Sequence, residues 1–114
     1  MKIQEKENRI YFDNLTAYGN ISIHNDYIKL ELIRVHAQYR RKGFARELLN
    51  KIIQYIKENF IQKKVILSPL PISNGGNNDT ILNLPKLITF YKNNNFTESK
   101  EKTQDEPYLM VRYL

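Results

Sequence analysis

The stretch YRRKGFARELL, residues 39–49, decides the fold of this 114-residue chain. The run before it, residues 28–35, is apolar enough for a buried strand. Residues 44–60 after it repeat their apolar positions at the three- and four-residue steps of an amphipathic helix. A strand, a basic turn and a helix in this order form a cradle for an anion, because the first turn of a helix has unpaired backbone N–H groups and the positive end of the helix dipole.

The turn between the strand and the helix is basic and contains a glycine. Gly43 lets a ligand approach the backbone closely, while Arg40, Arg41 and Lys42 bring cationic groups to the same place, which suits a pyrophosphate. A Walker loop is excluded because the turn has no Gly-Lys-Ser/Thr ending. A Rossmann loop is excluded because it needs three spaced glycines, and this turn has one.

The letters of this turn resemble motif A of the GNAT superfamily of acyl-CoA-dependent N-acyltransferases. That motif is Gln/Arg-x-x-Gly-x-Gly/Ala, and residues 40–45 are RRKGFA. Residues 33–39 are similar to the strand and turn that precede the motif in the family, with Ala37 where proline is common. The resemblance implies acetyl-CoA as the cofactor, with the backbone of Ile33 to Val35 along its pantetheine arm. It also implies a set of residues that hold the pyrophosphate: Arg40, Arg41, Lys42, Gly43, Phe44, Ala45 and Arg46.

A second stretch, FYKNNNF at residues 90–96, resembles the GNAT motif Phe/Leu-Tyr-x-x-x-Gly-Phe, with Asn95 in the glycine position. In the family this tyrosine lies near the sulfur of the acyl carrier. The resemblance therefore implies that Tyr91 protonates the departing thiolate. The alternative is an ordinary helix tyrosine that packs on Phe90 and Leu87. Two motifs in the family's order favour the catalytic interpretation.

Glu31 is the candidate general base. Many relatives have a glutamate at this spacing, here nine residues before Arg40, and use it to deprotonate the substrate amine directly or through water. A charged group on a central strand is costly unless it faces a cleft or has a partner. A structural role, in which the carboxylate pairs with a neighbouring lysine or arginine, is an equally good interpretation.

The composition indicates a single globular domain over residues 1–114, with 41% hydrophobic and 26% charged residues. There is no cysteine, and the two histidines, His24 and His36, are not spaced as ligands, so no disulfide and no metal site are expected. Both histidines are expected on the surface or in turns. No apolar run reaches transmembrane length and no signal-peptide core is present, which favours a cytoplasmic protein without a membrane partner.

The formal net charge is +6, and it is concentrated around the turn. Residues 34–64 contain nine lysines and arginines but two glutamates. Such asymmetry is compatible with nucleic acid. A highly phosphorylated cofactor and a solvated helix face explain it as well, and the segment has few aromatic side chains for stacking on bases. We therefore do not expect a nucleic-acid partner.

The rest of the chain predicts an α+β fold of three layers. A central mixed, mostly antiparallel sheet is expected, with the long helix after the pyrophosphate turn and a second helix near the C-terminus. Along residues 27–35, strict alternation would place Ile28, Leu30 and Leu32 on one face, and Glu31, Ile33 and Val35 on the other. The other expected elements are one or two edge strands in residues 1–12, strands 16–23 and 64–68, a functional or mobile loop 69–83, a helix 85–94 ended by Asn95 in the left-handed conformation, and a hairpin of 96–100 with 108–114.

These observations together predict an N-acetyltransferase that transfers an acetyl group from acetyl-CoA directly to an amine. No cysteine is present, and the serines lack the context of a nucleophile elbow (Ser22, Ser68, Ser73 and Ser99), so no acyl-enzyme is expected. The acceptor stays open; a protein lysine and small-molecule amines are candidates, and the protein is expected as a monomer or homodimer. Relatives carry two helices between their first two strands, and this chain has no room for them before Thr16, which favours an open acceptor side. The alternative function is a catalytically silent GNAT-fold module that binds nucleic acid through its basic face.

Overall fold

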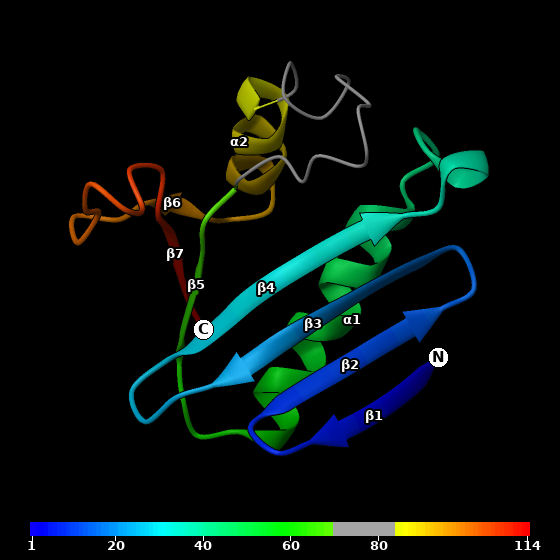
Figure 1. Cartoon of the computed structure of the whole chain (residues 1–114), viewed down its shortest axis with the longest axis horizontal. Helices are drawn as coiled ribbons and strands as arrows, with labels where there is room; N and C mark the ends of the chain where they lie inside the picture. Colours follow the sequence, from blue (N-terminus) through cyan, green and yellow to red (C-terminus); the bar gives the residue numbers. More distant parts are fainter. Residues whose placement is uncertain (70–83) are drawn as a thin grey trace. The chain divides into compact units, whose positions relative to one another are not determined.

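A computed structural model describes residues 1–69 and 84–114 (Figure 1). The elements are β1 (Lys2–Lys6), β2 (Arg9–Asn14), β3 (Ala17–Ile23), β4 (Ile28–Val35), the 3₁₀ turn η1 (Ala37–Tyr39), α1 (Phe44–Asn59), β5 (Lys64–Leu67), α2 (Leu84–Asn93), β6 (Thr97–Glu98) and β7 (Met110–Tyr113). The seven strands are paired in the order β1-β2-β3-β4-β5-β7-β6. The strands pair antiparallel where β1 meets β2, β2 meets β3, β3 meets β4, and β6 meets β7. The prediction of an α+β fold with a mixed, mostly antiparallel sheet is confirmed.

The chain divides into two compact units. The first unit comprises Met1–Val65 with Tyr113–Leu114, and the second comprises Ile66–Arg112. The first unit begins with a four-stranded antiparallel meander. Its β1 ends at Lys6 and its β2 begins at Arg9, so no helix lies between the first two strands, as the sequence predicted.

One face of the meander packs against α1. Figure 1 looks onto the opposite face, with α1 behind the strands. The buried side of the helix is aliphatic and consists of Leu48, Leu49, Ile52, Ile53 and Ile56. A Cβ on Gly19 would lie 3.4 Å from Ile52 Cδ1 and 2.5 Å from the Leu32 carbonyl oxygen, so the helix approaches β3 where a side chain is missing. Phe12 and Tyr55 meet edge to face at 5.3 Å on the same side.

A β-bulge in β4 changes the expected alternation of that strand. Asn20 pairs with Leu32 and Ile21 pairs with Leu30, so Glu31 is the extra residue. After the bulge Ile33 pairs with Gly19. A Cβ built on Gly19 would face α1, and the side chain of Ile33 lies 3.4 Å from that position. The prediction that Ile33 and Val35 share a face with Glu31 is therefore wrong. The bulge turns both aliphatic residues toward α1.

The second unit contains α2 and the β6–β7 hairpin. Its core is formed by buried side chains that include Tyr91, Phe96, Leu109, Met110 and Val111. The predicted second helix is confirmed, and Asn95 after it has φ 70°, the left-handed conformation expected from the sequence. The loop expected over 69–83 falls, from residue 70 on, outside the described residues.

Candidate active site

The predicted pyrophosphate turn begins where β4 ends. The chain leaves Val35 through η1, and Arg41 and Gly43 both have positive φ angles, 65° and 81°. These two residues turn the chain sharply into α1, with Gly43 as the N-cap. The rings of Tyr39 and Phe44 meet edge to face with their centroids 5.9 Å apart. This contact joins the two ends of the turn and stabilises it.

The N-terminus of α1 has free donors and open space beside them. The first backbone bond of the helix runs from the Glu47 N–H to the Gly43 carbonyl at 3.1 Å. The N–H groups of Phe44, Ala45 and Arg46 precede that bond, so the helix itself supplies no acceptor for them. No heavy atom of the described residues lies within 4 Å of a Cβ built on Gly43, apart from its own chain neighbours. A ligand can therefore come up to the backbone from this side.

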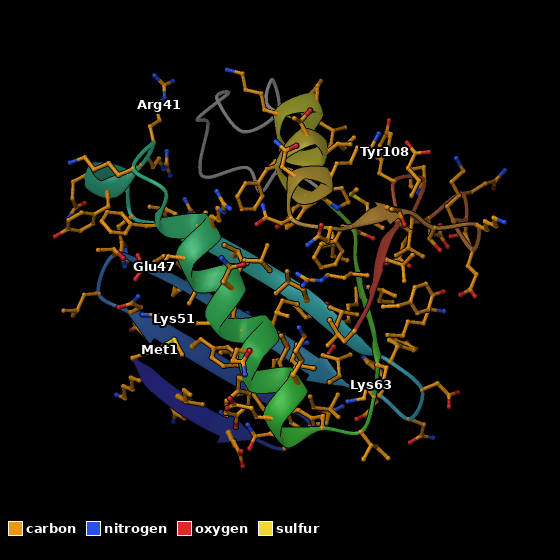
Figure 2. All side chains as sticks on the ribbon, turned by 180° about the vertical axis from the view of Figure 1, so that it is seen from behind. Met1, Arg41, Glu47, Lys51, Lys63 and Tyr108 are labelled. Carbon is orange, nitrogen blue, oxygen red and sulfur yellow. The ribbon has the colours of Figure 1, made fainter. Side chains whose placement is uncertain are left out.

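The basic side chains of the turn are mostly exposed. Arg40, Arg41, Lys42 and Arg46 all project into solvent, and Figure 2 shows Arg41 pointing out from the turn. Arg40 also donates a hydrogen bond from Nε to the Val35 carbonyl at 3.3 Å, which ties the turn to the end of β4. One turn into the helix, Glu47 pairs with Lys51 at 3.3 Å rather than with the cations of the turn (Figure 2).

Glu31 lies on the meander face opposite α1, within a polar cluster. The register pairs Arg9 with Ser22 and Ser22 with Lys29 on that face. Ser22 Oγ donates to Glu31 Oε2 at 3.1 Å, and the guanidinium of Arg9 lies 3.6 Å from the same oxygen. Lys29 Nζ lies 3.8 Å from the other carboxylate oxygen. The carboxylate thus has the cationic partners of a structural role, while 22% of its side chain is exposed to solvent.

Tyr91 lies near the end of α2 in the second unit. Its ring meets Phe90 at 5.1 Å and Phe96 at 5.7 Å, both edge to face. Its carbonyl accepts the N–H groups of Asn94 and Phe96, each at 3.0 Å, and Asn94 Nδ2 donates to the Phe90 carbonyl at 2.7 Å. The helix end that the second motif describes is therefore firmly fixed, with Asn95 doing what glycine does in the family pattern.

Burial raises the pKa of the Tyr91 hydroxyl to about 12, because the phenolate would have to form away from water. The hydroxyl accordingly keeps its proton at neutral pH. A group in this state can donate a hydrogen bond or a proton, but it cannot act as a base.

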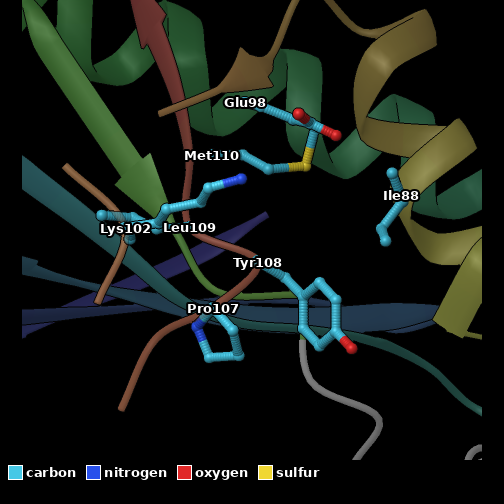
Figure 3. A pocket seen from close by; sticks show the side chains of 7 residues that line it. All are labelled: Ile88, Glu98, Lys102, Pro107, Tyr108, Leu109 and Met110. Carbon is cyan, nitrogen blue, oxygen red and sulfur yellow. The ribbon is translucent and has the colours of Figure 1, made fainter. Parts of the chain in front are cut away.

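A hollow of about 170 Å³ opens in the second unit (Figure 3). It is lined by Ile88, Glu98, Lys102, Pro107, Tyr108, Leu109 and Met110. Ligand pockets usually enclose roughly 300–1,000 Å³, so this hollow is too small for a nucleotide cofactor. Helix α2 contributes Ile88 to it, and the other lining residues belong to the β6–β7 hairpin.

The structure brings the predicted cofactor residues together in one continuous segment of the first unit. Ile33 and Val35 lead into the turn of Arg40, Arg41, Lys42 and Gly43, and Phe44, Ala45 and Arg46 form the first turn of α1. Glu31 lies two residues before Ile33 on the same strand, and Tyr91 belongs to the second unit. Sequence reasoning missed Arg9 and Ser22, which contact Glu31, and His24, which contacts Ser22. Ser22 lies near the end of β3 and His24 directly follows that strand, but the contact of Ser22 with Glu31 depends on strand pairing.

Within residues 1–69 and 84–114, neither helix has the length and apolar character that crossing a membrane requires. The model of the acetyltransferase (GNAT) family matches residues 4–73. This range includes the meander except the first residues of β1, together with α1, β5 and the whole predicted pyrophosphate turn. No curated protein matches the sequence.

Several solved structures share the fold. The anti-CRISPR protein AcrVA5 superposes with a TM-score of 0.69 at 18% identity, covering 91% of this chain and 97% of that protein. Spermidine N-acetyltransferase from Vibrio cholerae, crystallised with CoA and spermine, gives a TM-score of 0.68 at 18% identity, covering 94% of this chain and 66% of that one. PaiA N-acetyltransferase from Thermoplasma acidophilum, crystallised with coenzyme A, gives 0.66 at 15%, covering 94% and 62%. This chain thus spans about two thirds of the length of these two enzymes.

Proposed function

The chain belongs to the acetyltransferase (GNAT) family, and from this premise we propose that it is an N-acetyltransferase that uses acetyl-CoA. The acetyl group passes directly from the CoA sulfur to the nitrogen of an acceptor amine. The amine attacks the thioester carbonyl, the C–S bond breaks, and the products are the N-acetylated acceptor and CoA. The acceptor carries a primary amine, and a protein lysine and a small polyamine are both candidates.

The observation that carries this proposal is the cradle at the start of α1. Three first-turn N–H groups lie outside the helix ladder, Gly43 leaves the space beside them open, and four cationic side chains surround the turn. A pyrophosphate matches this arrangement in charge and in its number of acceptor oxygens. The Ile33–Val35 backbone leads directly into the turn, so we assign it to the pantetheine arm of the same ligand.

Two side chains are assigned to the proton transfers. Glu31 takes the proton that the amine must lose, directly or through water. Tyr91 donates to the sulfur as the thiolate leaves, and its pKa of about 12 keeps the proton in place until then. A thiol is a stronger acid than this phenol by about three pKa units. Tyr91 therefore acts as a hydrogen-bond donor that stabilises the developing thiolate.

Acetyl-CoA binding is tested by thermal unfolding with and without the cofactor. A ligand present at 100 times its Kd and binding only the folded state stabilises by about 2.7 kcal/mol. For a chain of this size that raises the Tm by on the order of 10 °C. A catalytically silent module that lacks a cofactor site would show no shift.

The variants Gly43→Asp and Gly43→Asn form a matched pair for the cradle. Both residues tolerate the left-handed backbone at this position, and they have the same shape, but aspartate places a negative charge against the pyrophosphate. We expect the acetyl-CoA shift to disappear in Gly43→Asp and to persist, reduced, in Gly43→Asn. Equal shifts in both folded variants and the parent would remove the turn from cofactor binding.

The acceptor is identified by incubating the protein with labelled acetyl-CoA and separate amines: spermidine, a lysine-containing peptide and a peptide with a free N-terminus. Mass spectrometry then shows which one gains an acetyl group. Acetyl-CoA binding without transfer to any amine, including those of whole-cell extract, would contradict the proposed activity and favour the binding module.

A further inference from the structure

Beyond the carboxylate itself, Glu31 is connected to the β3–β4 turn by a short chain of polar groups. Ser22 Oγ lies 3.1 Å from Glu31 Oε2 and 2.9 Å from Nε2 of His24. Ser22 is 5% exposed, so its hydroxyl exchanges hydrogen bonds with these two groups in a nearly dry place. The three side chains stand in the order Glu31, Ser22, His24, from the candidate base to the end of the strand.

This order differs from that of a hydrolytic triad. In a Ser-His-Asp triad the carboxylate bonds the histidine and leaves the serine free to attack. Here the carboxylate bonds the serine itself, and the serine is buried. The arrangement is unsuited to a nucleophile, but it has the connectivity of a proton relay with an acid group at one end and an imidazole at the other.

His24 is held in place and is half-buried at the end of β3. Its ring stacks on Tyr27 at 4.5 Å with an angle of 19° between the planes. Its backbone N–H donates to the Tyr27 carbonyl at 3.0 Å, and its carbonyl accepts from Gln62 Nε2 at 2.7 Å. A ring fixed in this way keeps Nε2 on Ser22, so the imidazole has Nδ1 left for exchange with water.

We propose that Ser22 and His24 relay the proton of the acceptor amine from Glu31 to solvent. The inference rests on the proposed function of Glu31 as the base. Once Glu31 has gained the proton, its hydroxyl donates to Ser22 Oγ while the Ser22 hydroxyl donates to Nε2 of neutral His24. The Glu31 proton moves to Oγ and the Ser22 proton moves to Nε2. Glu31 is then a carboxylate again, Ser22 is unchanged, and His24 is a cation that releases its Nδ1 proton to water.

The direction of transfer follows from ordinary acidities. A carboxylic acid is a stronger acid than an imidazolium ion by about two pKa units, so the proton moves downhill. Arg9 and Lys29 flank the carboxylate and pair with its two oxygens. This step leaves His24 protonated at Nε2 and donating to Ser22, while Ser22 donates to Glu31. Before the next turnover the imidazole must therefore return to the tautomer protonated at Nδ1, by exchanging its ring protons with water.

The test compares turnover of His24→Ala, Ser22→Ala and the control His36→Ala, using the amine found to accept labelled acetyl. His36 is the chain's other histidine and is exposed. We expect His24→Ala and Ser22→Ala each to lose about 100-fold in kcat, the lower end of the range for proton transfer by side chains. Imidazole added to the buffer should restore His24→Ala in proportion to its concentration. It should not restore Ser22→Ala, and His36→Ala should match the parent.

Two further variants separate the possible failures. His24→Gln keeps an N–H group for Ser22 but cannot carry a proton. It should therefore also be slow, and because it keeps this hydrogen bond it controls for poor folding of His24→Ala. Parental turnover in the His24 and Ser22 variants, together with a slow Glu31→Gln, would overturn the relay and leave the base in place, with water taking the proton directly. Parental turnover in Glu31→Gln would overturn the assignment of the base and the relay together.

Discussion

Tyr91→Phe tests the burial of the candidate acid through the pH dependence of stability. The pKa of Tyr91 is about 12 in the folded protein and that of an unfolded tyrosine is about 10. Because the folded pKa is the higher one, the hydroxyl's contribution to stability is fully present below pH 10 and is lost as the pH rises toward 12. Two pKa units correspond to about 2.7 kcal/mol in total, and about half of this, about 1.4 kcal/mol, is lost by pH 11.

The assay is urea unfolding of the parent and Tyr91→Phe at pH 8 and pH 11. Other tyrosines titrate in both proteins and cancel in the comparison. The parent should lose about 1.4 kcal/mol more than the variant between the two pH values. Tyr113→Phe, at a position 70% exposed, is the control and should lose as much as the parent. Equal losses in the parent and Tyr91→Phe would mean that Tyr91 is hydrated, and the argument from burial would be refuted.

The same variant measures catalysis, since the phenyl ring keeps its contacts with Phe90 and Phe96. If the hydroxyl serves the departing thiolate, turnover should fall by roughly 10²–10⁴-fold while acetyl-CoA affinity hardly changes. Turnover equal to that of the parent would remove Tyr91 from the chemistry and leave it as a core residue.

Three further substitutions test the geometry of the meander. Gly19→Ala should destabilise by about 1–3 kcal/mol in urea unfolding, because its Cβ would stand 2.5 Å from the Leu32 carbonyl oxygen; unchanged stability would contradict the close packing. Asn20→Leu should stabilise by about 1–3 kcal/mol, because Asn20 Oδ1 is buried and has no hydrogen-bond partner among the described residues; a loss of stability would show that a donor such as water reaches this oxygen. Glu31→Gln should lower turnover most at low pH, where more of the amine is protonated, and a pH profile like that of the parent would make Glu31 structural.

The elements that the sequence predicted well are those whose signals are local. The start of α1 follows from a basic turn with glycine, and its length follows from apolar residues at helical spacing. The end of α2 follows from Asn95, which adopts the left-handed conformation more readily than most residues. In each case the deciding residues lie within a few positions of one another, so no long-range pairing has to be known.

An ion pair of Glu31 with a lysine or arginine was one of its two predicted roles, but which residues surround it depends on pairing across three strands and was not predicted. Arg9 reaches the carboxylate from β2, and Ser22 reaches it from β3. Residues this far apart in sequence become neighbours through the register of the sheet, which short stretches do not encode. The two interpretations of Glu31, base and ion-pair partner, also prove compatible, because the carboxylate has ionic partners and keeps an exposed side.

The bulge at Glu31 has a physical reason that the sequence does contain. If the alternation that places Ile28 and Leu30 toward α1 continued along the strand IKLELIRV, Arg34 would also point toward α1, where a charged group would be buried among aliphatic side chains. The apolar positions change phase between Leu32 and Ile33, so a regular strand cannot satisfy both halves. One extra residue restores agreement, since Ile33 and Val35 turn toward α1 and Arg34 turns away. Because β4 ends at Val35, shortly before the predicted pyrophosphate turn, Glu31 also sets which way the strand faces as it approaches that turn.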